Sequence, residues 1–270
     1  MFLDIDYEPC QGRVLQENGY LCFLPPLPLS HWVQSFWQLN IPDGQYSYRS
    51  VPDNSVDLII NLNCPEDAFV VTPFSSSIVF ELTGPASYFG IRFRLLGHHG
   101  LISAPLGEWG ARGADIPALE LLPDHILHAV YESLCRPHQF TARCKHLTTL
   151  LLDTVKHPSL DPRLVRFIRY CQNNISSNIS LADKQCAEFG LSSRQLRRLA
   201  HLHLGLSPTE FSKVMRFQRA LKIMSAAGDK AAWTGCYYDQ PHFIREFKSL
   251  SGLTPSEFRR LSVLYNNKLS

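Results

Sequence analysis

Three arginines stand close together in the C-terminal third of this 270-residue sequence, at Arg194, Arg197 and Arg198. A guanidinium group can bond to the O6 and N7 atoms of guanine together, so arginines suit the recognition of base edges or phosphates. Leu196 and Leu199 have the spacing of the apolar side of a helix, which turns the three arginines outward. These residues predict binding chemistry rather than catalysis.

A second group of polar side chains follows at Gln240, His242 and Arg245. Phe243 and Phe247 are the apolar positions of this second helix, so its polar side chains should also point outward. A glutamine amide can form two hydrogen bonds with adenine in the major groove of DNA. Both groups therefore contain side chains that suit the edges of bases.

The two groups occupy equivalent places in a sequence repeat. Residues 205–211, GLSPTEF, return as residues 252–258, GLTPSEF, at an offset of 47 residues, and the same offset relates Arg198 to Arg245. Each copy predicts a short helix, a tight turn and a second helix, which is the helix-turn-helix pattern. In that motif the second helix enters the major groove, and its first turns face the bases.

Capping sequences mark where these helices begin and end. Ser207 and Thr254 are each followed by proline and, at the third helical position, by glutamate, which predicts two capping boxes. Gly205 and Gly252 suit the left-handed position that ends a helix. The first unit has similar signals: capping boxes at Ser180 with Asp183 and at Ser192 with Gln195, helix starts near Leu181 and Ser193, and a turn at Gly190.

A long helix should connect the two units, from Pro208 to about Ala226. At 1.5 Å per residue it would be roughly 28 Å long. That length can hold two recognition helices near the ~34 Å repeat of one DNA turn, so both would reach the same face. Its apolar side chains should pack against both units: Phe211, Val214, Met215, Leu221 and Met224.

Residues 180–260 resemble the DNA-binding domain of AraC/XylS-type transcriptional regulators. The likeness is closest at residues 237–248, YYDQPHFIREFK, and at residues 252–259, GLTPSEFR. Cys236 and Cys186 depart from the family pattern, which usually has glycine and alanine there. By alignment, the resemblance implies DNA-binding roles for eight residues: Ser193, Arg194, Arg197, Arg198, Gln240, His242, Arg245 and Lys248.

The resemblance implies a sequence-specific DNA-binding regulator, expected to be a cytoplasmic activator and a homodimer. Double-stranded DNA is the expected partner, and no cofactor, metal or catalytic residue is predicted. It leaves open whether the chain contacts RNA polymerase or binds a small-molecule effector. It also leaves open an N-terminal protein-docking module that binds no small ligand. An enzyme such as a fused DNA-repair alkyltransferase is disfavoured, because it would need a reactive cysteine beside a histidine or a basic residue.

Residues 1–120 predict an antiparallel β sandwich or barrel, because short apolar segments alternate with Pro, Gly and Asn-Asp signals. A turn is expected at Pro42-Asp43-Gly44. Short segments at 51–59, 88–94 and 105–108 resemble the jelly-roll-like N-terminal domains of some AraC-type regulators. The predicted strands are 20–24, 33–41, 46–51, 56–62, 68–72, 77–83 and 87–95.

Two helices should follow the strands, one after Pro123 and one at about 141–155. Their leucine rows, including Leu147 and Leu151, could cover the sheet or pair with a second subunit, and the resemblance favours pairing. With a linker near residues 157–162, the fold class is α+β. A sensing or dimerisation domain at 1–157 precedes an all-α DNA-binding domain of two helix-turn-helix units at 161–270.

Charge is divided unequally between these parts. Residues 160–270 hold 17 Lys/Arg and 8 Asp/Glu, whereas residues 1–159 hold 9 Lys/Arg and 16 Asp/Glu. A basic C-terminal part fits the binding of a polyanion. No apolar run reaches the roughly 18 residues of a membrane span, and the N-terminal residues do not resemble a signal peptide, so a cytoplasmic location is expected.

Other polar residues predict structural roles. The eight cysteines lack metal-binding spacing and suit buried free thiols. His98 and His99 are expected in a Gly-flanked loop without metal, and Asp53 in a turn. Arg92 and Arg94 share one strand face, where an internal ion pair or a solvated face is favoured over an anionic ligand.

Overall fold

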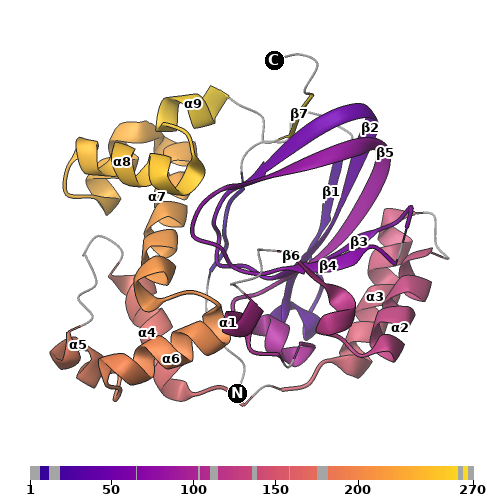
Figure 1. Cartoon of the computed structure of the whole chain (residues 1–270), viewed down its shortest axis with the longest axis horizontal. Helices are drawn as coiled ribbons and strands as arrows, with labels where there is room; N and C mark the ends of the chain where they lie inside the picture. Colours follow the sequence, from indigo (N-terminus) through magenta and orange to yellow (C-terminus); the bar gives the residue numbers. More distant parts are fainter. Residues whose placement is uncertain are drawn as a thin grey trace.

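The computed structural model describes residues 7–11, 19–64, 66–102, 104–109, 115–135, 139–157, 159–174, 182–260 and 264–266. Within these ranges a sheet region, residues 20–157, precedes a helical region, residues 162–260 (Figure 1). The predicted capping residue Ser180 and helix start Leu181 lie outside the described residues. None of the described helices is long and apolar enough to cross a membrane.

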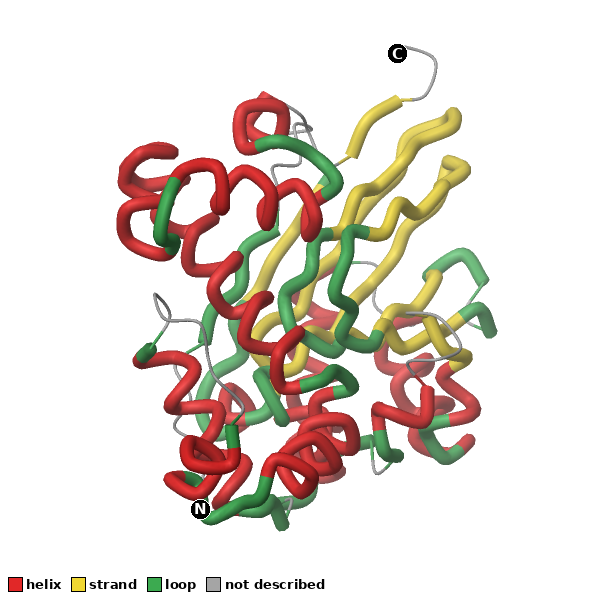
Figure 2. Tube along the Cα trace, turned by 60° about the vertical axis from the view of Figure 1, so that its left-hand side comes forward, coloured by secondary structure: helices red, strands yellow, loops and turns green. Residues whose placement is uncertain are grey.

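Antiparallel strands form the sheet region. Their order across the sheet is β1-β2-β5-β3-β4-β6, and β7, near the C-terminus, pairs with β2. The described strands form one curved sheet, which confirms the predicted antiparallel β fold (Figure 2). The strands are β1 Tyr20–Phe23, β2 Val33–Ser50, β3 Asp57–Asn61, β4 Ala68–Val71, β5 Ile78–Phe93, β6 Asp115–Pro117 and β7 Leu264–Asn266.

β2 and β5 are longer than predicted. The turn expected at Pro42-Asp43-Gly44 is a bulge inside β2, with a register shift between Ile41 and Gly44. Gly84 of β5 lies against this bulge, and a Cβ there would come within 1.7 Å of the Pro42 carbonyl oxygen. The bulge bends both strands instead of reversing the chain. Two pairs of predicted strands are therefore single strands: 33–41 with 46–51, and 77–83 with 87–95.

Two helices cover one face of the sheet. Phe36 and Phe89 on that face are fully buried, and they share a core with Leu147 and Leu151. Because these leucines are buried within the chain, the expectation that they form a seam between subunits is wrong. The covering helices are α2 Asp124–Cys135 and α3 Phe140–Thr154.

The helical region follows the predicted order. α5 begins at Asp183, two residues after the predicted start. α7 is broken at Gly228, where φ is 82° and ψ is 177°. The part before this break is the predicted connecting helix, and all five predicted apolar side chains on it are buried. The helices are α4 Pro162–Asn173, α5 Asp183–Glu188, α6 Ser193–Leu204, α7 Pro208–Cys236, α8 Gln240–Ser251 and α9 Pro255–Arg260.

A shared hydrophobic core joins the two regions. It combines most buried side chains of the helical region with Val51, Leu95 and Leu96 of the sheet region. At the junction α1 packs against α6. Apolar packing therefore holds the helical region against the sheet region. The short elements are η1 Leu29–His31, η2 Gly97–Gly100, α1 Leu106–Trp109 and η4 Ala118–Glu120.

Candidate nucleic-acid interface

α6 presents the three predicted arginines to solvent. Arg194, Arg197 and Arg198 are exposed, whereas Leu196 and Leu199 are 1% and 7% exposed. The apolar side of the helix packs into the core that holds the helical region together. The predicted division between an inward apolar side and an outward basic side is confirmed by this burial.

The turn before α6 is held by two sets of hydrogen bonds. The Ser192 hydroxyl accepts from the Gln195 N–H at 3.2 Å, and the Gln195 side chain accepts from the Ser192 N–H at 2.9 Å, as the capping box predicted. Gly190 has a φ of 76°, a left-handed conformation that favours glycine. Beside it, Arg166 donates to the Phe189 carbonyl at 2.9 Å. These contacts fix the start of a recognition helix, whose half-buried first residue is Ser193.

α8 repeats this arrangement in the second unit. Gln240, Arg245 and Lys248 are exposed, while Phe243 and Phe247 are buried. The two recognition helices thus have equivalent apolar sides and equivalent outward polar sides.

The turn before α8 is built differently. Tyr237, which stands where Gly190 stands in the first unit, is extended with a φ of −133°. Cys236 ends the preceding helix and is 1% exposed. Asp239 caps α8, and its carboxylate accepts from the His242 N–H at 2.7 Å. The second turn therefore forms without a left-handed glycine.

A buried ion pair fixes α8 against α7, and the sequence analysis missed it. Arg216 donates to the two Glu246 carboxylate oxygens at 2.8 and 2.6 Å, and neither side chain is more than 10% exposed. Burial disfavours the charge on Arg216, but the hydrogen bonds to Glu246 outweigh that effect and raise the pKa of Arg216. The guanidinium also lies 5.3 Å from the centre of the Tyr237 ring. The pair joins residues 30 positions apart, and no local pattern marks it.

His242 belongs to the same network. It is half-buried rather than fully outward, with its Nε2 atom 3.7 Å from Glu246. Its ring packs edge-on against Tyr237. The four-residue spacing of His242 and Glu246 on one helix is the sequence signal that could have indicated this contact.

The helical region touches the sheet region at the far ends of both recognition helices. A Cβ on Gly205, just after α6, would lie 3.7 Å from Pro73. A Cβ on Gly252, just after α8, would lie 2.9 Å from the Ser77 hydroxyl. The Ser77 N–H also donates to the Leu250 carbonyl at 2.7 Å. The loop of residues 73–77, here called the docking loop, therefore contacts the equivalent turns of both units.

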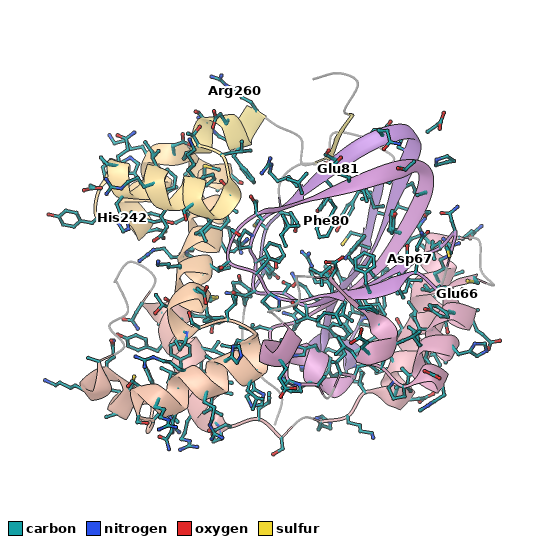
Figure 3. All side chains as sticks on the ribbon, viewed as in Figure 1. Glu66, Asp67, Phe80, Glu81, His242 and Arg260 are labelled. Atoms are coloured by element: carbon teal, nitrogen blue, oxygen red, sulfur yellow. The ribbon has the colours of Figure 1, made fainter. Side chains whose placement is uncertain are left out.

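The first turns of α6 and α8 point away from the sheet region. In Figure 1, α6 meets α1 with its C-terminal end. Figure 3 shows His242, in the first turn of α8, on the side of the helical region that faces away from the sheet. The ends that read bases in a helix-turn-helix are therefore the ends remote from the docking loop.

Arg197 also faces a cleft between the two regions. The cleft holds about 600 Å³, and Arg197, His201, Glu210 and the docking loop line it. The Ser75 hydroxyl donates to Glu210 across this junction at 3.3 Å. The exposed Arg197 side chain therefore also lies beside the sheet region.

The sheet face opposite α2 and α3 lines a cavity of about 550 Å³. Arg92 in its lining donates to Asp57 at 3.0–3.2 Å and lies 3.3 Å from Asp53. Asp53 accepts from the Ser55 N–H, as expected of an aspartate in a turn. The favoured internal ion pair for Arg92 is confirmed, and Arg94 donates instead to the Ser30 carbonyl.

Histidines meet at the junction of the two regions. His98 and His99 lie in η2, and His99 Nε2 is 3.3 Å from Nδ1 of His203 on α6. Burial, with a smaller effect of His203, lowers the pKa of His99 to about 4. The described residues contain no group of three or more His, Cys, Asp or Glu arranged to hold a metal ion.

All eight cysteines are free, but the prediction that they are buried holds for only four. Cys144, Cys171, Cys186 and Cys236 are buried. The other four lie near the surface: Cys10 is partly buried, and Cys22, Cys64 and Cys135 are exposed.

Two family models match separate parts of the chain. Residues 185–261 match a helix-turn-helix domain, HTH_18. Residues 22–115 match a domain of unknown function, DUF6597. No curated protein matches the chain.

Three solved structures illustrate the structural likeness. An apo ToxT variant from Vibrio cholerae is 13% identical over 91% of this chain and 98% of that chain, with a TM-score of 0.41. Unsaturated fatty acid-bound ToxT from the same species is 12% identical over 90% and 95%, with a TM-score of 0.40. A probable AraC family regulator from Rhodopseudomonas palustris is 28% identical over 37% and 96%, with a TM-score of 0.31. All three TM-scores are below 0.5.

Proposed function

We propose that this member of the AraC/XylS family of transcriptional regulators binds a specific DNA site with α6 and α8 and responds to a ligand in its sheet region. The observation that carries the proposal is the pair of equivalent recognition helices. Both expose polar first turns, and the docking loop contacts the turn at the opposite end of each. Two such helices on one body can enter successive major-groove segments of one DNA face.

The proposed DNA contacts are of two chemical kinds, contacts with base edges and contacts with phosphates. Arg194, Arg197 and Arg198 on α6, and Gln240 and Arg245 on α8, have side chains that can bond to base edges. The shorter or more peripheral side chains of Ser193, His242 and Lys248 suit phosphate contacts that set the position of the protein on DNA.

The proposed domains are residues 1–157 for sensing and dimerisation and residues 161–270 for DNA binding. Homodimerisation must use a surface other than the buried Leu147 and Leu151. Leu24 and Leu27, 71% and 72% exposed, are candidates for it. Contact with RNA polymerase, activation of transcription and location in the cytoplasm belong to the same proposal.

A direct route links the cavity to the DNA-binding helices. Pro52 accepts a hydrogen bond from Gln218 of α7 at 2.6 Å, and Asn54 donates to the Phe211 carbonyl of α7 at 3.2 Å. Between them lies Asp53, the partner of Arg92. A ligand that binds differently to two arrangements of this segment can therefore shift the helix that connects the two units.

Selection of bound duplexes from a random pool, with the full-length chain, tests this function. We expect one enriched site with two half-motifs about one helical turn apart, and an affinity that falls steeply with salt. Arg194→Ala should weaken binding to that site, whereas Lys145→Ala, which removes an exposed positive charge on α3, should not. A pool without an enriched sequence, or equal effects of both variants, would overturn the proposal.

A further inference from the structure

The cavity of the sheet region has the features of a site for a positively charged organic ligand. We infer that it binds an organic cation, an amine or quaternary ammonium group on an apolar body. Only the regulatory consequence of this binding rests on the proposed function. The binding itself rests on the shape, the aromatic lining and the charge of the cavity.

The cavity is an aromatic-lined space of suitable size. Its volume of about 550 Å³ lies in the range of sites for small organic molecules. Six aromatic side chains from four strands of the sheet line it: Tyr20, Trp37, Tyr48, Phe69, Phe80 and Tyr88. The faces of such rings carry partial negative charge and attract cations, tryptophan most strongly.

Strand register brings these rings to one face of the sheet. Tyr20 pairs with Leu39, and Tyr48 pairs directly with Phe80 across β2 and β5. Gly90 opposite Trp37 leaves room for the indole ring, because a Cβ there would lie 2.0 Å from it. The aromatic lining is therefore built into the pairing of the strands and does not depend on flexible loops.

Asp57 and Arg92 line the cavity, whereas Asp53 is buried beside Arg92 and does not line it. This cluster of three groups carries one negative charge in excess when all three are ionised. Arg92 lies between Asp57 and Asp53, at 3.0 and 3.3 Å from their nearest oxygens. Burial raises the pKa of Asp53, and the neighbouring Asp57 raises it further, against the opposing effect of Arg92. When Asp53 is ionised, one guanidinium faces two carboxylates, and a bound cation would supply the missing positive charge.

The same groups disfavour an anionic ligand. Among the described residues that line the cavity, Arg92 is the only Lys or Arg, and both carboxylates already engage it. A ligand carboxylate would add a second excess negative charge to a buried site. A neutral ligand could fill the space but would leave the existing charge uncompensated.

The neighbouring hydrogen bonds hold this charge in place. The Trp37 indole N–H donates to Asp57 at 3.0 Å, and the Gln11 amide donates to Asp53 at 2.8 Å. Burial raises the pKa of Tyr48 to about 12, so its hydroxyl stays neutral. The aromatic face and the carboxylates are therefore preformed before a ligand arrives, as efficient recognition requires.

Three matched probes test the ligand class on the full-length chain: benzyltrimethylammonium, its neutral isostere neopentylbenzene, and phenylacetate. Titration followed by tryptophan fluorescence and calorimetry should show saturable binding of the cation. We expect at least tenfold weaker binding of the neutral probe and no measurable binding of phenylacetate. Equal or tighter binding of the neutral probe or of phenylacetate would overturn the inference.

Two variants locate the site. Asp53→Asn keeps the side-chain shape but removes the excess charge, so cation affinity should fall about tenfold while the neutral probe is unaffected. Phe80→Leu removes one ring at a half-buried position, where the risk of misfolding is lower. It should reduce the affinity for the cation about two- to fivefold. Glu81→Gln is the matched control, because Glu81 follows Phe80 on β5 (both labelled in Figure 3) and does not line the cavity. Loss of cation binding in the control, or unchanged binding in both Asp53→Asn and Phe80→Leu when they are folded, would contradict the assignment.

The same titration repeated with the selected DNA site separates this inference from the proposed function. A change in DNA affinity on addition of the cation supports both. Cation binding without any change in DNA affinity supports the ligand class and contradicts ligand sensing.

Discussion

Gly205 and Gly252 occupy the same place in the two repeats, and both pack against the docking loop of the sheet region. Each glycine ends a recognition helix in the left-handed conformation, with φ of 69° and 76°. The nearest loop residues, Pro73 and Ser77, are only four positions apart. One short segment can therefore set the relative position of both DNA-reading helices, which makes their spacing sensitive to the sheet region.

Arg49 should contribute to this docking. Its guanidinium lies 3.3 Å from the Ser77 hydroxyl and 3.5 Å from the Ser251 carbonyl. Arg49→Ala should loosen the second unit and speed amide hydrogen exchange at Ser77, whose N–H bonds to Leu250. Exchange at Gly190, in the first unit, should not change. Similar acceleration at both places would instead indicate general destabilisation.

Gln218 should couple the cavity segment to α7. Its side chain is 3% exposed, accepts from the Cys10 N–H at 2.7 Å and donates to Pro52 at 2.6 Å. Gln218→Leu would leave the buried Pro52 carbonyl and the partly buried Cys10 N–H without this partner, which should lower the free energy of unfolding by about 1–3 kcal/mol. Lys222→Ala, one turn further along α7 and 58% exposed, should change it by less than about 0.5 kcal/mol. Denaturant unfolding of both variants measures the difference.

The effects on stability of replacing Arg216 and Glu246 should not add. Glu246→Leu alone leaves a buried positive charge and should destabilise the protein by about 3–5 kcal/mol. Replacing both partners, Arg216→Met with Glu246→Leu, should recover most of that loss, because no charge remains buried. A double mutant as unstable as the sum of the two single variants would contradict the buried-pair interpretation.

Much of the helical region could be predicted from the sequence because its signals are local. The Ser192 and Ser207 capping boxes and the glycines at 205 and 252 act within a few residues. The Arg216–Glu246 pair and the docking loop depend on contacts far apart in the chain, so no short pattern indicates them. Whether Pro42-Asp43-Gly44 forms a bulge or a turn depends on Gly84 in the partner strand, so the local sequence alone predicts a turn. The partner of the α3 leucines is likewise not evident from the sequence, because an amphipathic helix does not reveal which surface covers it.

The histidines at the junction predict a loss of stability in mild acid. Burial, followed by the effects of its histidine neighbours, lowers the pKa of His98, and burial lowers that of His203 against the opposing effect of Asp161. In the unfolded chain these histidines take up protons below about pH 6.5. In the folded chain the pKa values are lower, about 4 for His99, so protonation there requires more acid. The free energy of unfolding should therefore fall as pH decreases through this window, by up to about 1.4 kcal/mol per pH unit for each such histidine. Comparison of His99→Gln with His128→Gln, at an exposed position, tests this, because only the first should flatten the pH profile.

The central claim is that α6 and α8 read two segments of one DNA site. Methylation interference at guanine N7, which lies in the major groove, tests it most directly on the selected duplex. We predict two interfering clusters about one helical turn apart, with Arg194→Ala removing sensitivity in only one cluster and Arg245→Ala in only the other. A single cluster, or the loss of the same positions in both variants, would contradict the account.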